Sequence, residues 1–445
     1  MAIRLIITAH LILFTSIFSI ALAQQEEDVD DIKGKILSLE DCIEIAVEGH
    51  PDIRSKRAEV KAGKSRVGQS FSSFLPFLDF SSGYSRSEVN QGHSNALSDS
   101  RDNYIIGFSL SQNIFDFGRS LSLWRMSKEE ARAISYVLNT TGQDIVFKLE
   151  EEYYSHLKAL RLEKVNQEAF ASAELHLKQA RGFYEAGTRP KIDVARAEVD
   201  VSNAKVDLIK AENGVRLSKV RLDNAMGLGE PVSYQIKDDL EFKTSDYQID
   251  EILSLAYINR PELLELDAGL KAMSHKIDLC RQEHLPKLTA RFYYNWEGES
   301  TPLDREWKAG VTLDLPIFSG LDTSYKLSEA RDNWRGAKAR IGGLKLQIRK
   351  EVEQALLSLR EAEEMLSATE IAVEQAKENL RLAEGRYEVG LATIIDLTDA
   401  RVLLLDAETN RIQALCDHKI AGALIERAAG TIPFSISNLE LRTEN

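Results

Sequence analysis

The sequence predicts an α+β membrane protein built from two tandem repeats, each running helix, strand, strand, long helix, helix. Three observations lead to this fold class. The chain aligns with itself at a nearly constant offset, four segments alternate apolar and polar residues as strands do, and two long segments without proline are rich in helix-forming residues. With 445 residues, 43% of them hydrophobic and 28% charged, the chain is large enough to fold into ordered domains.

Residues 1–23 have the features of a secretory signal peptide. Arg4 gives a short positive region, residues 5–22 are mostly apolar, and Ala21-Leu22-Ala23 offers a small-x-small cleavage site. We therefore expect the mature chain to be exported. No cysteine follows the cleavage site to suggest a lipid anchor, and no later apolar run of about 18 residues predicts a transmembrane helix.

The mature chain carries a strong negative charge. Removal of residues 1–23 takes away only Arg4 of the 56 basic residues, so the net charge falls from −14 to −15. This charge argues against nucleic acid or an anionic membrane surface as a partner. Cys42, Cys280 and Cys416 are odd in number and lack C-x-x-C spacing, so we expect small core residues and neither a zinc site nor a disulfide framework.

The two repeats align at an offset of 203 over their helical parts: Tyr184-Glu185-Ala186-Gly187 matches Tyr387-Glu388-Val389-Gly390, Asp193 matches Asp396, and Gly227 matches Gly430. Upstream, Leu75-Pro76 matches Leu285-Pro286 at an offset of 210, so seven extra residues lie between Pro76 and Gly107. We expect a first repeat at 24–227, an equatorial linker at 228–250, a second repeat at 251–430 and a C-terminal tail at 431–445.

In the first repeat, a helix at 51–74 precedes strands at about 76–86 and 104–115, a long helix at 119–186 and a return helix at 190–226. Leu78, Phe80 and Tyr84 in one strand, and Ile106, Phe108 and Leu110 in the other, mark an apolar face. No proline interrupts the chain between 76 and 190, as a long helix requires. At 1.5 Å per residue that helix spans about 100 Å and needs neighbours along its length.

The second repeat predicts a helix at 261–284, strands at about 286–297 and 306–316, a long helix at 321–389 and a return helix at 393–429. Leu288, Phe292 and Trp296 alternate with Lys287, Arg291 and Asn295, and the next strand behaves likewise from Trp307. Such strands suit a transmembrane β-barrel, although a sheet packed on helices in a soluble protein gives a similar pattern. The linker contains two short candidate strands, 234–236 and 240–242.

Four strands cannot close a barrel. An open sheet edge in lipid would leave backbone groups unsatisfied, at several kcal/mol each. Several copies of the chain must therefore share one barrel. Two copies would give eight strands with a filled interior, whereas three would give twelve strands and leave room for a lumen.

The tandem copies, the junctions NIFDFGR and LPIFSGL, and the turns FYEAGTRPKIDVARAEV and RYEVGLATIIDLTDARVLL resemble the TolC family of outer membrane efflux proteins. The resemblance covers nearly all of the mature chain. It implies a homotrimer in the outer membrane of a Gram-negative bacterium, with a 12-stranded β-barrel continuous with a periplasmic α-helical barrel. It also implies three partners: a periplasmic adaptor protein, an inner-membrane pump of the RND, ABC or MFS type, and outer membrane lipid. Gly118 and Gly320 would permit the bend at each junction.

The resemblance places a gate at the far ends of the long helices. Asp396 and Asp399, which share one helix face, would narrow a closed aperture, and Tyr387 would hold it shut. The turns around Gly187-Thr188 and Gly390-Leu391 would meet the adaptor. A plainer alternative is that Thr393 caps the helix, Asp396 complements its dipole and Asp399 is only solvated, with the turns as simple connectors.

The chain departs from the family at this gate. Ala392 stands where some members have an arginine, and Arg196 occupies the position that Asp399 has in the second repeat. We therefore expect a different latch, with Arg189 or Arg196 pairing to Asp193. Ile395, Val402, Leu405 and Ile412 are expected to form a coiled-coil seam.

The predicted function is an outer membrane channel-tunnel of a tripartite efflux or type I secretion system, which passively conducts the substrates of an inner-membrane pump. The alternative is a periplasmic coiled-coil scaffold or adaptor that forms no pore, but such a protein does not need amphipathic strands rich in Trp and Tyr. We expect no enzyme, cofactor or metal site, because G-x-S-x-G, H-E-x-x-H and phosphate-loop motifs are absent from the sequence. Residues 432–445 are expected to form a poorly ordered extension, and no role is assigned to them.

Overall fold

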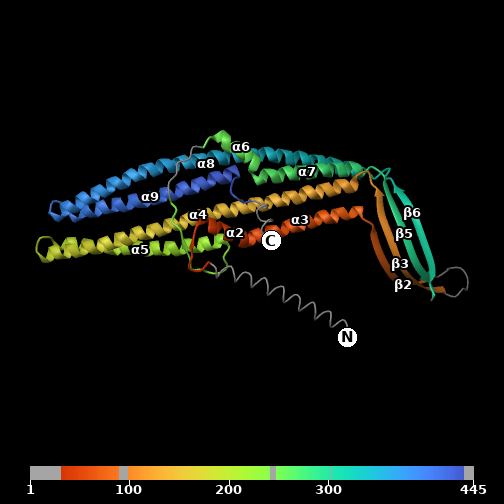
Figure 1. Cartoon of the computed structure of the whole chain (residues 1–445), viewed down its shortest axis with the longest axis horizontal. Coiled ribbons are helices and arrows are strands. Elements are labelled where there is room, and N and C mark those ends of the chain that lie inside the picture. The colour runs from red at the N-terminus through yellow and green to blue at the C-terminus, as the bar shows by residue number, and fades with distance from the viewer. Residues whose placement is uncertain (1–31, 90–98, 241–246, 301, 435–445) are drawn as a thin grey trace, which may run out of the picture. The chain divides into compact units, whose positions relative to one another are not determined.

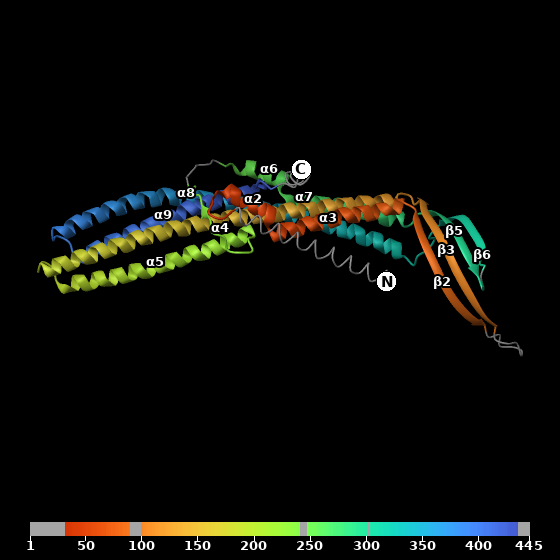
Figure 2. The same cartoon turned by 60° about the horizontal axis from the view of Figure 1, so that its bottom comes forward.

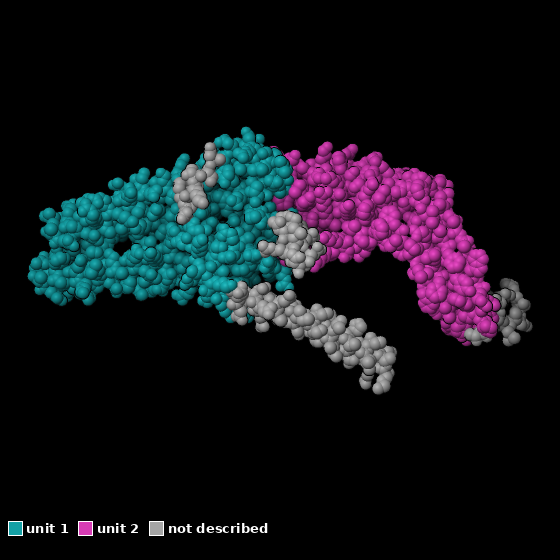
Figure 3. All heavy atoms as spheres, viewed as in Figure 1, with its two compact units in different colours: residues 1–55, 139–260, 347–445 teal, residues 56–138, 261–346 magenta. Residues whose placement is uncertain are grey.

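The computed structural model describes residues 32–89, 99–240, 247–300 and 302–434, so the predicted signal peptide at 1–23 lies outside the described residues. The chain divides into two compact units (Figure 3). Unit 1 comprises residues 1–55, 139–260 and 347–445, and unit 2 comprises residues 56–138 and 261–346. Each unit therefore contains segments of both repeats.

Unit 2 contains a four-stranded antiparallel sheet in the order β2-β3-β5-β6 (Figure 1). Its strands are β2 (Phe77–Val89), β3 (Asp99–Phe115), β5 (Lys287–Gly298) and β6 (Asp304–Asp314). Each repeat contributes one hairpin, and the pairing of β3 with β5 joins the two repeats. Within the described residues, β2 and β6 are the edges of this sheet and pair with no further strand.

The strand register places apolar side chains opposite one another across the whole sheet. Phe80 lies opposite Phe108, Phe108 opposite Tyr294, and Tyr294 opposite Trp307. The rings of Phe80 and Phe108 are in contact, with centroids 5.2 Å apart. Because successive residues of a strand point to opposite faces, one face of the sheet is apolar and aromatic and the other is polar.

Helices lead into and out of each hairpin. Before the hairpins come α3 (Pro51–Phe71) with a 3-10 turn (Ser72–Phe74), and α7 (Pro261–Gln282); after them come α4 (Arg119–Glu185) and α8 (Asp322–Glu388). Proline begins both α3 and α7, where its missing N–H costs no hydrogen bond. In unit 2, Gly63 lets α3 approach α4 closely, since a Cβ there would lie 3.3 Å from Ile134.

In unit 1, α5 (Lys191–Met226) and α9 (Ile394–Ala429) return beside the long helices, as Figures 1 and 2 both show. Each return helix ends at a glycine with positive φ, Gly227 at 77° and Gly430 at 71°. A Cβ on Gly227 would lie 2.9 Å from the backbone of His50, and one on Gly430 would lie 2.9 Å from the backbone of Arg260. Conformation and close packing therefore both require glycine at these two equivalent ends.

Two short helices and a two-stranded sheet complete unit 1. The helices are α2 (Leu39–Gly49) and α6 (Ile249–Asn259), and β1 (Ile36–Leu37) pairs in parallel with β4 (Gln235–Ile236). The sequence did not predict the helices or β1, whereas β4 confirms the candidate strand at 234–236. Helix α2 and the two strands pack around a core that contains Cys42, Leu149, Tyr153, Met226 and Cys416, whereas α6 packs against α9. The linker is tied to α4, because the Tyr153 hydroxyl donates to the carbonyl of Lys237 at 2.7 Å and Arg161 pairs with Asp238 at 2.7 Å.

Two expectations need correction here. Leu240 belongs to no strand, and the rest of the candidate strand at 240–242 lies outside the described residues. The start of the tail is packed rather than unattached, since Ile432 and Phe434 are both buried. The ring of Phe434 lies where a Cβ on Gly142 would be, so the absence of a side chain at 142 makes room for it. Residues 435–445 lie outside the described residues.

All three cysteines are buried and free, which confirms that they are core residues. Burial raises the pKa of the Cys42 and Cys416 thiols to about 12, so both stay protonated and unreactive at neutral pH.

Candidate functional site

The first functional feature is the apolar face of the sheet in unit 2. Leu78, Phe80, Trp307, Val311 and Leu313 are all between 62% and 69% exposed. An apolar surface of this extent on both edge strands is unusual for a chain that acts alone in water. Both edges also present unpaired backbone groups, which lipid cannot satisfy. The sheet is therefore suited to an apolar environment and to pairing with further strands.

No helix within the described residues is both long enough and apolar enough to cross a bilayer.

The second feature is the pair of tip turns in unit 1. Gly187 and Gly390 have φ values of 71° and 84°, the left-handed conformation that ends many helices. In each turn the following residue donates its N–H back into the helix: Thr188 to the carbonyl of Phe183 at 3.0 Å, and Leu391 to that of Arg386 at 2.8 Å. No described atom lies within 4 Å of a Cβ built on either glycine, so the backbone conformation alone requires glycine.

Tyr387 lies at the centre of the contact between the two tip hairpins. Its side chain is only 3% exposed and packs with Ala392, Ile394 and Leu397. From the first repeat, the ring of Phe183 approaches it edge-on at 6.1 Å. The buried aromatic ring therefore joins the second hairpin to the first.

Arg189 extends from the first hairpin to the second. Its guanidinium lies over the Tyr387 ring at 4.7 Å and donates to the carbonyls of Tyr387 and Ala392 at 3.0 and 3.3 Å. At the repeat offset of 203, Arg189 is the equivalent of Ala392 itself. The second repeat thus lacks an arginine at position 392, but the first repeat has one at the equivalent position, 189. Arg189 contacts Ala392, the residue that stands in place of the arginine in the second repeat.

The expected pairing of Asp193 with Arg189 or Arg196 is not formed among the described residues. Asp193 is buried, whereas Arg196 is exposed. Burial, then the negative charge of Asp193, raises the pKa of Tyr387, while Arg189 opposes this shift. The Tyr387 hydroxyl is buried with no hydrogen-bond partner among these residues. The hydroxyl is therefore a neutral group held by packing and by the arginine.

Asp396 and Asp399 are both exposed on α9. Asp396 forms a capping box: it accepts from the N–H and the hydroxyl of Thr393 at 2.8 Å each, and its own N–H donates to that hydroxyl at 3.3 Å. The backbone and side-chain hydrogen bonds from Thr393 hold the pKa of Asp396 below its usual value. Within one chain, then, the capping interpretation describes Asp396, and its carboxylate remains ionised and exposed.

The predicted coiled-coil seam was wrong at two positions. Ile395 and Val402 are about half exposed, while Ile394, Leu397 and Ala400 are buried. The stripe that packs against α8 thus begins one residue earlier than expected. On a helix with 3.6 residues per turn, the adjacent apolar stripes are hard to distinguish by spacing alone.

A hydrogen bond missed by the sequence reasoning also joins the two hairpins. The Thr398 hydroxyl donates to the Asp200 carboxylate at 2.8 Å, linking α9 to α5. Beside it lies a cavity of about 430 Å³ that includes Arg401, whose Nε and Nη2 are buried with no hydrogen-bond partner in the described part of the chain. Burial lowers the pKa of this guanidinium to about 10, so it remains charged. No motif marks these residues in the sequence.

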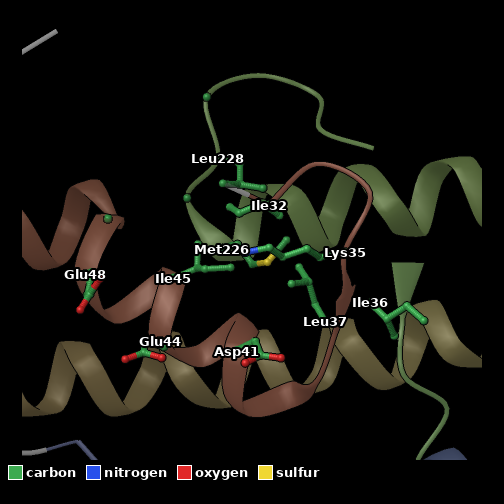
Figure 4. A pocket seen from close by; sticks show the side chains of 13 residues that line it. Ile32, Lys35, Ile36, Leu37, Asp41, Glu44, Ile45, Glu48, Met226 and Leu228 are labelled. Atoms are coloured by element: carbon green, nitrogen blue, oxygen red, sulfur yellow. The ribbon is translucent and has the colours of Figure 1, made fainter. Parts of the chain in front are cut away.

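Another cavity, of about 350 Å³, lies at the core of unit 1 (Figure 4). The side chains of Ile32, Ile45, Met226 and Leu228 gather in its middle, whereas the carboxylates of Glu44 and Glu48 lie apart from them. It is an opening in the packing around α2 and the end of α5. No convergent polar groups mark it as a binding site.

Comparison with known proteins identifies the family. The family model described as "Outer membrane efflux protein" matches residues 42–228 and 252–431. The chain is 26% identical over 400 residues to outer membrane protein TolC of Vibrio cholerae, covering 87% of this chain and 89% of the relative. It is 23% identical over 406 residues to TolC of Escherichia coli, covering 86% and 80%.

A similar fold occurs in the CmeC outer membrane channel of Campylobacter jejuni, whose crystal structure has a TM-score of 0.80 at 18% identity and covers 91% of this chain and 89% of the channel. The two matched segments of the family model together span most of the chain. The chain therefore belongs to the outer membrane efflux protein family, and its location is the outer membrane, with a large periplasmic part.

Proposed function

We propose that three copies of this chain form a channel-tunnel that passively conducts the substrates of an inner-membrane pump across the periplasm and the outer membrane. The observation that carries the proposal is the four-stranded sheet with an exposed apolar face and two unpaired edges. A sheet of this kind in lipid requires closure. Three copies supply twelve strands, which is enough to enclose a lumen.

The alternative of a periplasmic scaffold without a pore is not favoured. A scaffold gains nothing from exposing Trp307, Val311 and Leu313 on an edge strand, because exposed apolar edges promote aggregation. In the channel these side chains face lipid, and β6 pairs with β2 of the next copy.

The tip hairpins support a gated periplasmic end. Arg189 holds the carbonyls of Tyr387 and Ala392 and so fixes the second hairpin to the first. Three copies would bring six exposed carboxylates, from Asp396 and Asp399, around one axis. Such a ring would restrict the aperture and attract cations. Opening then requires the two hairpins to separate, which breaks the contacts of Arg189.

The tips also present apolar side chains to solvent. Val389 and Leu391 are 70% and 73% exposed, and Ile192 is exposed at the start of α5. An amphipathic helical hairpin of an adaptor protein suits such a surface. The adaptor would connect the tips to the pump, so substrate choice would belong to the pump and not to this chain.

The test is the mass and the conductance of the full-length mature protein. In detergent, light scattering should give three chains per particle, and the sample should dissociate to monomers only on heating. In planar bilayers the particle should conduct ions. A monomer that carries no current would contradict the proposal.

The gate has its own test. Arg189→Ala removes the cross-hairpin contacts and should increase the open-channel conductance several-fold in planar bilayers. Arg196→Ala is the matched control, because Arg196 is an exposed arginine on the same hairpin and forms no ion pair within the described residues. Equal conductance of both variants and the unaltered protein would exclude Arg189 as a latch.

A further inference from the structure

Unit 2 contains a cavity of about 330 Å³ where the polar face of the sheet meets the start of α4. Its lining includes the 3-10 turn with Ser72 and Ser73, the end of β3 with Ser111, and the start of β5 from Lys287 to Arg291. Phe77 of β2 and Leu123 of α4 contribute apolar surface. The first residue of α4, Arg119, completes the wall. The lining is rich in hydroxyl groups and positive charge.

Three cationic side chains line this cavity, Arg119, Lys287 and Arg291, against a single carboxylate, Asp116. That carboxylate is already occupied, because it accepts from the N–H and hydroxyl of Ser120, the amide of Asn113 and the N–H of Gly118. These bonds shape the turn between β3 and α4. Asp116 therefore forms no ion pair with the cations beside it.

Few other groups among the described residues neutralise the charges of these three cationic side chains. Lys287 and Arg291 form no ion pair there, although Asp314 lies opposite Lys287 in the sheet. Arg119 donates through Nη2 to the carbonyls of Gln282 and Leu285 at 2.9 and 3.3 Å. Its Nε is buried with no hydrogen-bond partner. A buried N–H without an acceptor is costly, so this cavity both has excess positive charge and lacks an acceptor.

We propose that the cavity binds an oxyanion, a phosphate or carboxylate group. The hydroxyls of Ser72, Ser73 and Ser120 already donate to Gln69, Ser70 and Asp116. The donors for such oxygens are therefore the guanidinium groups, which are directional, and lysine adds a mobile charge. Within the proposed channel, on which this step rests, three copies would place nine cations around the lumen at the base of the barrel. Rings of Arg and Lys favour anions in pores. The ring of carboxylates at the tips would then favour cations, and this ring of cationic side chains at the base of the barrel would favour anions.

The test uses the full-length protein in planar bilayers with a KCl gradient. The reversal potential of the unaltered channel gives its chloride-to-potassium permeability ratio, and inorganic phosphate should reduce the chloride current. Lys287→Gln with Arg291→Gln should shift the ratio toward potassium by about threefold and abolish the phosphate effect. Arg291→Gln alone, an exposed side chain, should give part of the shift and tests the site if the double variant fails to fold.

Lys308→Gln is the matched control. Lys308 lies opposite Tyr293 on the same polar face and does not line the cavity. This variant should therefore keep the phosphate effect and shift the ratio less than the double variant. Membranes of phosphatidylcholine alone and with phosphatidylglycerol distinguish the anion's source. If phosphate reduces the chloride current in both membranes, the bound anion comes from solution. If phosphatidylglycerol removes this reduction, the bound anion is a lipid headgroup.

A conducting channel whose double variant keeps the unaltered ratio and phosphate effect would overturn the inference while leaving the proposed function intact. If the protein conducts no current, the proposed function fails, and isothermal titration of the detergent-solubilised protein with phosphate tests the cavity on its own. Binding that Lys287→Gln with Arg291→Gln weakens about tenfold or more would support the site. Equal heats for all variants would overturn it.

Discussion

The two strand-to-helix junctions of unit 2 follow the same backbone path with different chemistry. In the first, Phe117 and Gly118 have φ values of 57° and 89°; in the second, Gly320 and Leu321 have 65° and 69°. Each junction thus places a glycine and a bulky residue in the left-handed region, at a cost of roughly 1–2 kcal/mol for the residue that has a Cβ. Because both repeats adopt this unfavourable backbone conformation, we infer that the bend is needed at each strand-to-helix junction.

The two junctions differ in what stabilises the bend. In the first, the buried carboxylate of Asp116 accepts four hydrogen bonds and Arg119 anchors α4 to the end of α7. In the second, Ile317 and Phe318 are 92% and 81% exposed, and Ser319 with Thr323 makes one side-chain contact at 3.1 Å. The first junction is complete within one chain. The second has an apolar surface that suits lipid or a neighbouring copy.

The largest expected effect comes from breaking the self-contained junction. Asp116→Ala leaves four donors without their acceptor in a buried turn and should lower the free energy of unfolding by about 4 kcal/mol. Guanidinium denaturation in detergent, followed by tryptophan fluorescence, measures it. Ser319→Ala, which removes a link at the exposed junction, should cost less than about 0.5 kcal/mol. Equal costs would show that the two junctions are stabilised alike.

The second prediction concerns the apolar junction. Ile317→Ser with Phe318→Ser should leave the secondary structure of a single chain unchanged, because both side chains are exposed. It should weaken trimer assembly or insertion by about 3 kcal/mol, the scale of burying two such side chains. Circular dichroism and light scattering in detergent measure the two effects. A fully trimeric variant with unaltered heat resistance would contradict this division of roles.

A third prediction compares Asp116, whose carboxylate accepts four hydrogen bonds, with Glu150 in unit 1, whose carboxylate lacks a hydrogen-bond partner for one oxygen among the described residues. Burial, then repulsion from Glu426, raises the pKa of Glu150 from 4.5 to about 7, and its Oε2 has no hydrogen-bond partner among the described residues. The contribution of Glu150 to stability should therefore be fully present below pH 4.5 and be lost as the pH rises through about 7. Glu150→Gln should remove this decline and add about 2 kcal/mol at pH 8.

Asp116 should behave in the opposite way. Burial alone would raise its pKa, but the hydrogen bonds from Ser120, Asn113 and Gly118 outweigh burial and hold the pKa below 3.8. Its contribution is therefore present above about pH 3.8 and is lost as the pH falls further. Denaturation curves of Asp116→Ala and Glu150→Gln between pH 3 and 8 should separate the two pH ranges. Asp116→Ala should remove the loss of stability below about pH 3.8, and Glu150→Gln should remove the decline toward pH 7. Parallel pH profiles would contradict the assignment.

The smallest expected effect is at the tips, where the repeats differ again. Thr393 caps α9 through its side chain, whereas the N-cap residue of α5, Pro190, makes no side-chain hydrogen bond. Thr393→Val should cost about 1 kcal/mol locally and speed amide exchange at residues 394–397 about fivefold. Exchange at the start of α5 should not change, and a change there would mean that the two tips do not open independently.

The structure shows which parts of the fold follow from sequence pattern. Long proline-free runs predicted α4 and α8 closely, and alternation predicted the sheet and its apolar face, because helix and strand periodicity are local properties. Helices α2 and α6 were missed because each has only 11 residues and ends two residues before Pro51 or Pro261, where the predicted helices begin. The bonds of Arg189 and Thr398 were missed because they join hairpins about 200 residues apart in sequence.

The repeat also predicts how two copies meet. Phe108 lies opposite Tyr294 where β3 of the first repeat pairs with β5 of the second. The repeat equivalent of Phe108, 203 positions later, is Val311 of β6, and the equivalent of Tyr294, 210 positions earlier, is Tyr84 of β2. We therefore expect Val311 of one copy to lie opposite Tyr84 of the next. Both residues lie on the apolar face, so the derived register keeps that face continuous from one copy to the next. Within one chain, β6 and β2 are opposite edges of the sheet and cannot pair.

The most direct test of the account is therefore a disulfide between copies. Facing residues of antiparallel strands have Cβ atoms about 4.5–5.5 Å apart, close enough for a bridge. Mild oxidation of a protein carrying Tyr84→Cys and Val311→Cys should give covalent dimers and trimers on a denaturing gel. Either variant alone should give none, since the native cysteines are buried. A double variant that stays monomeric, while conducting normally, would contradict closure of the sheet by neighbouring copies in this register.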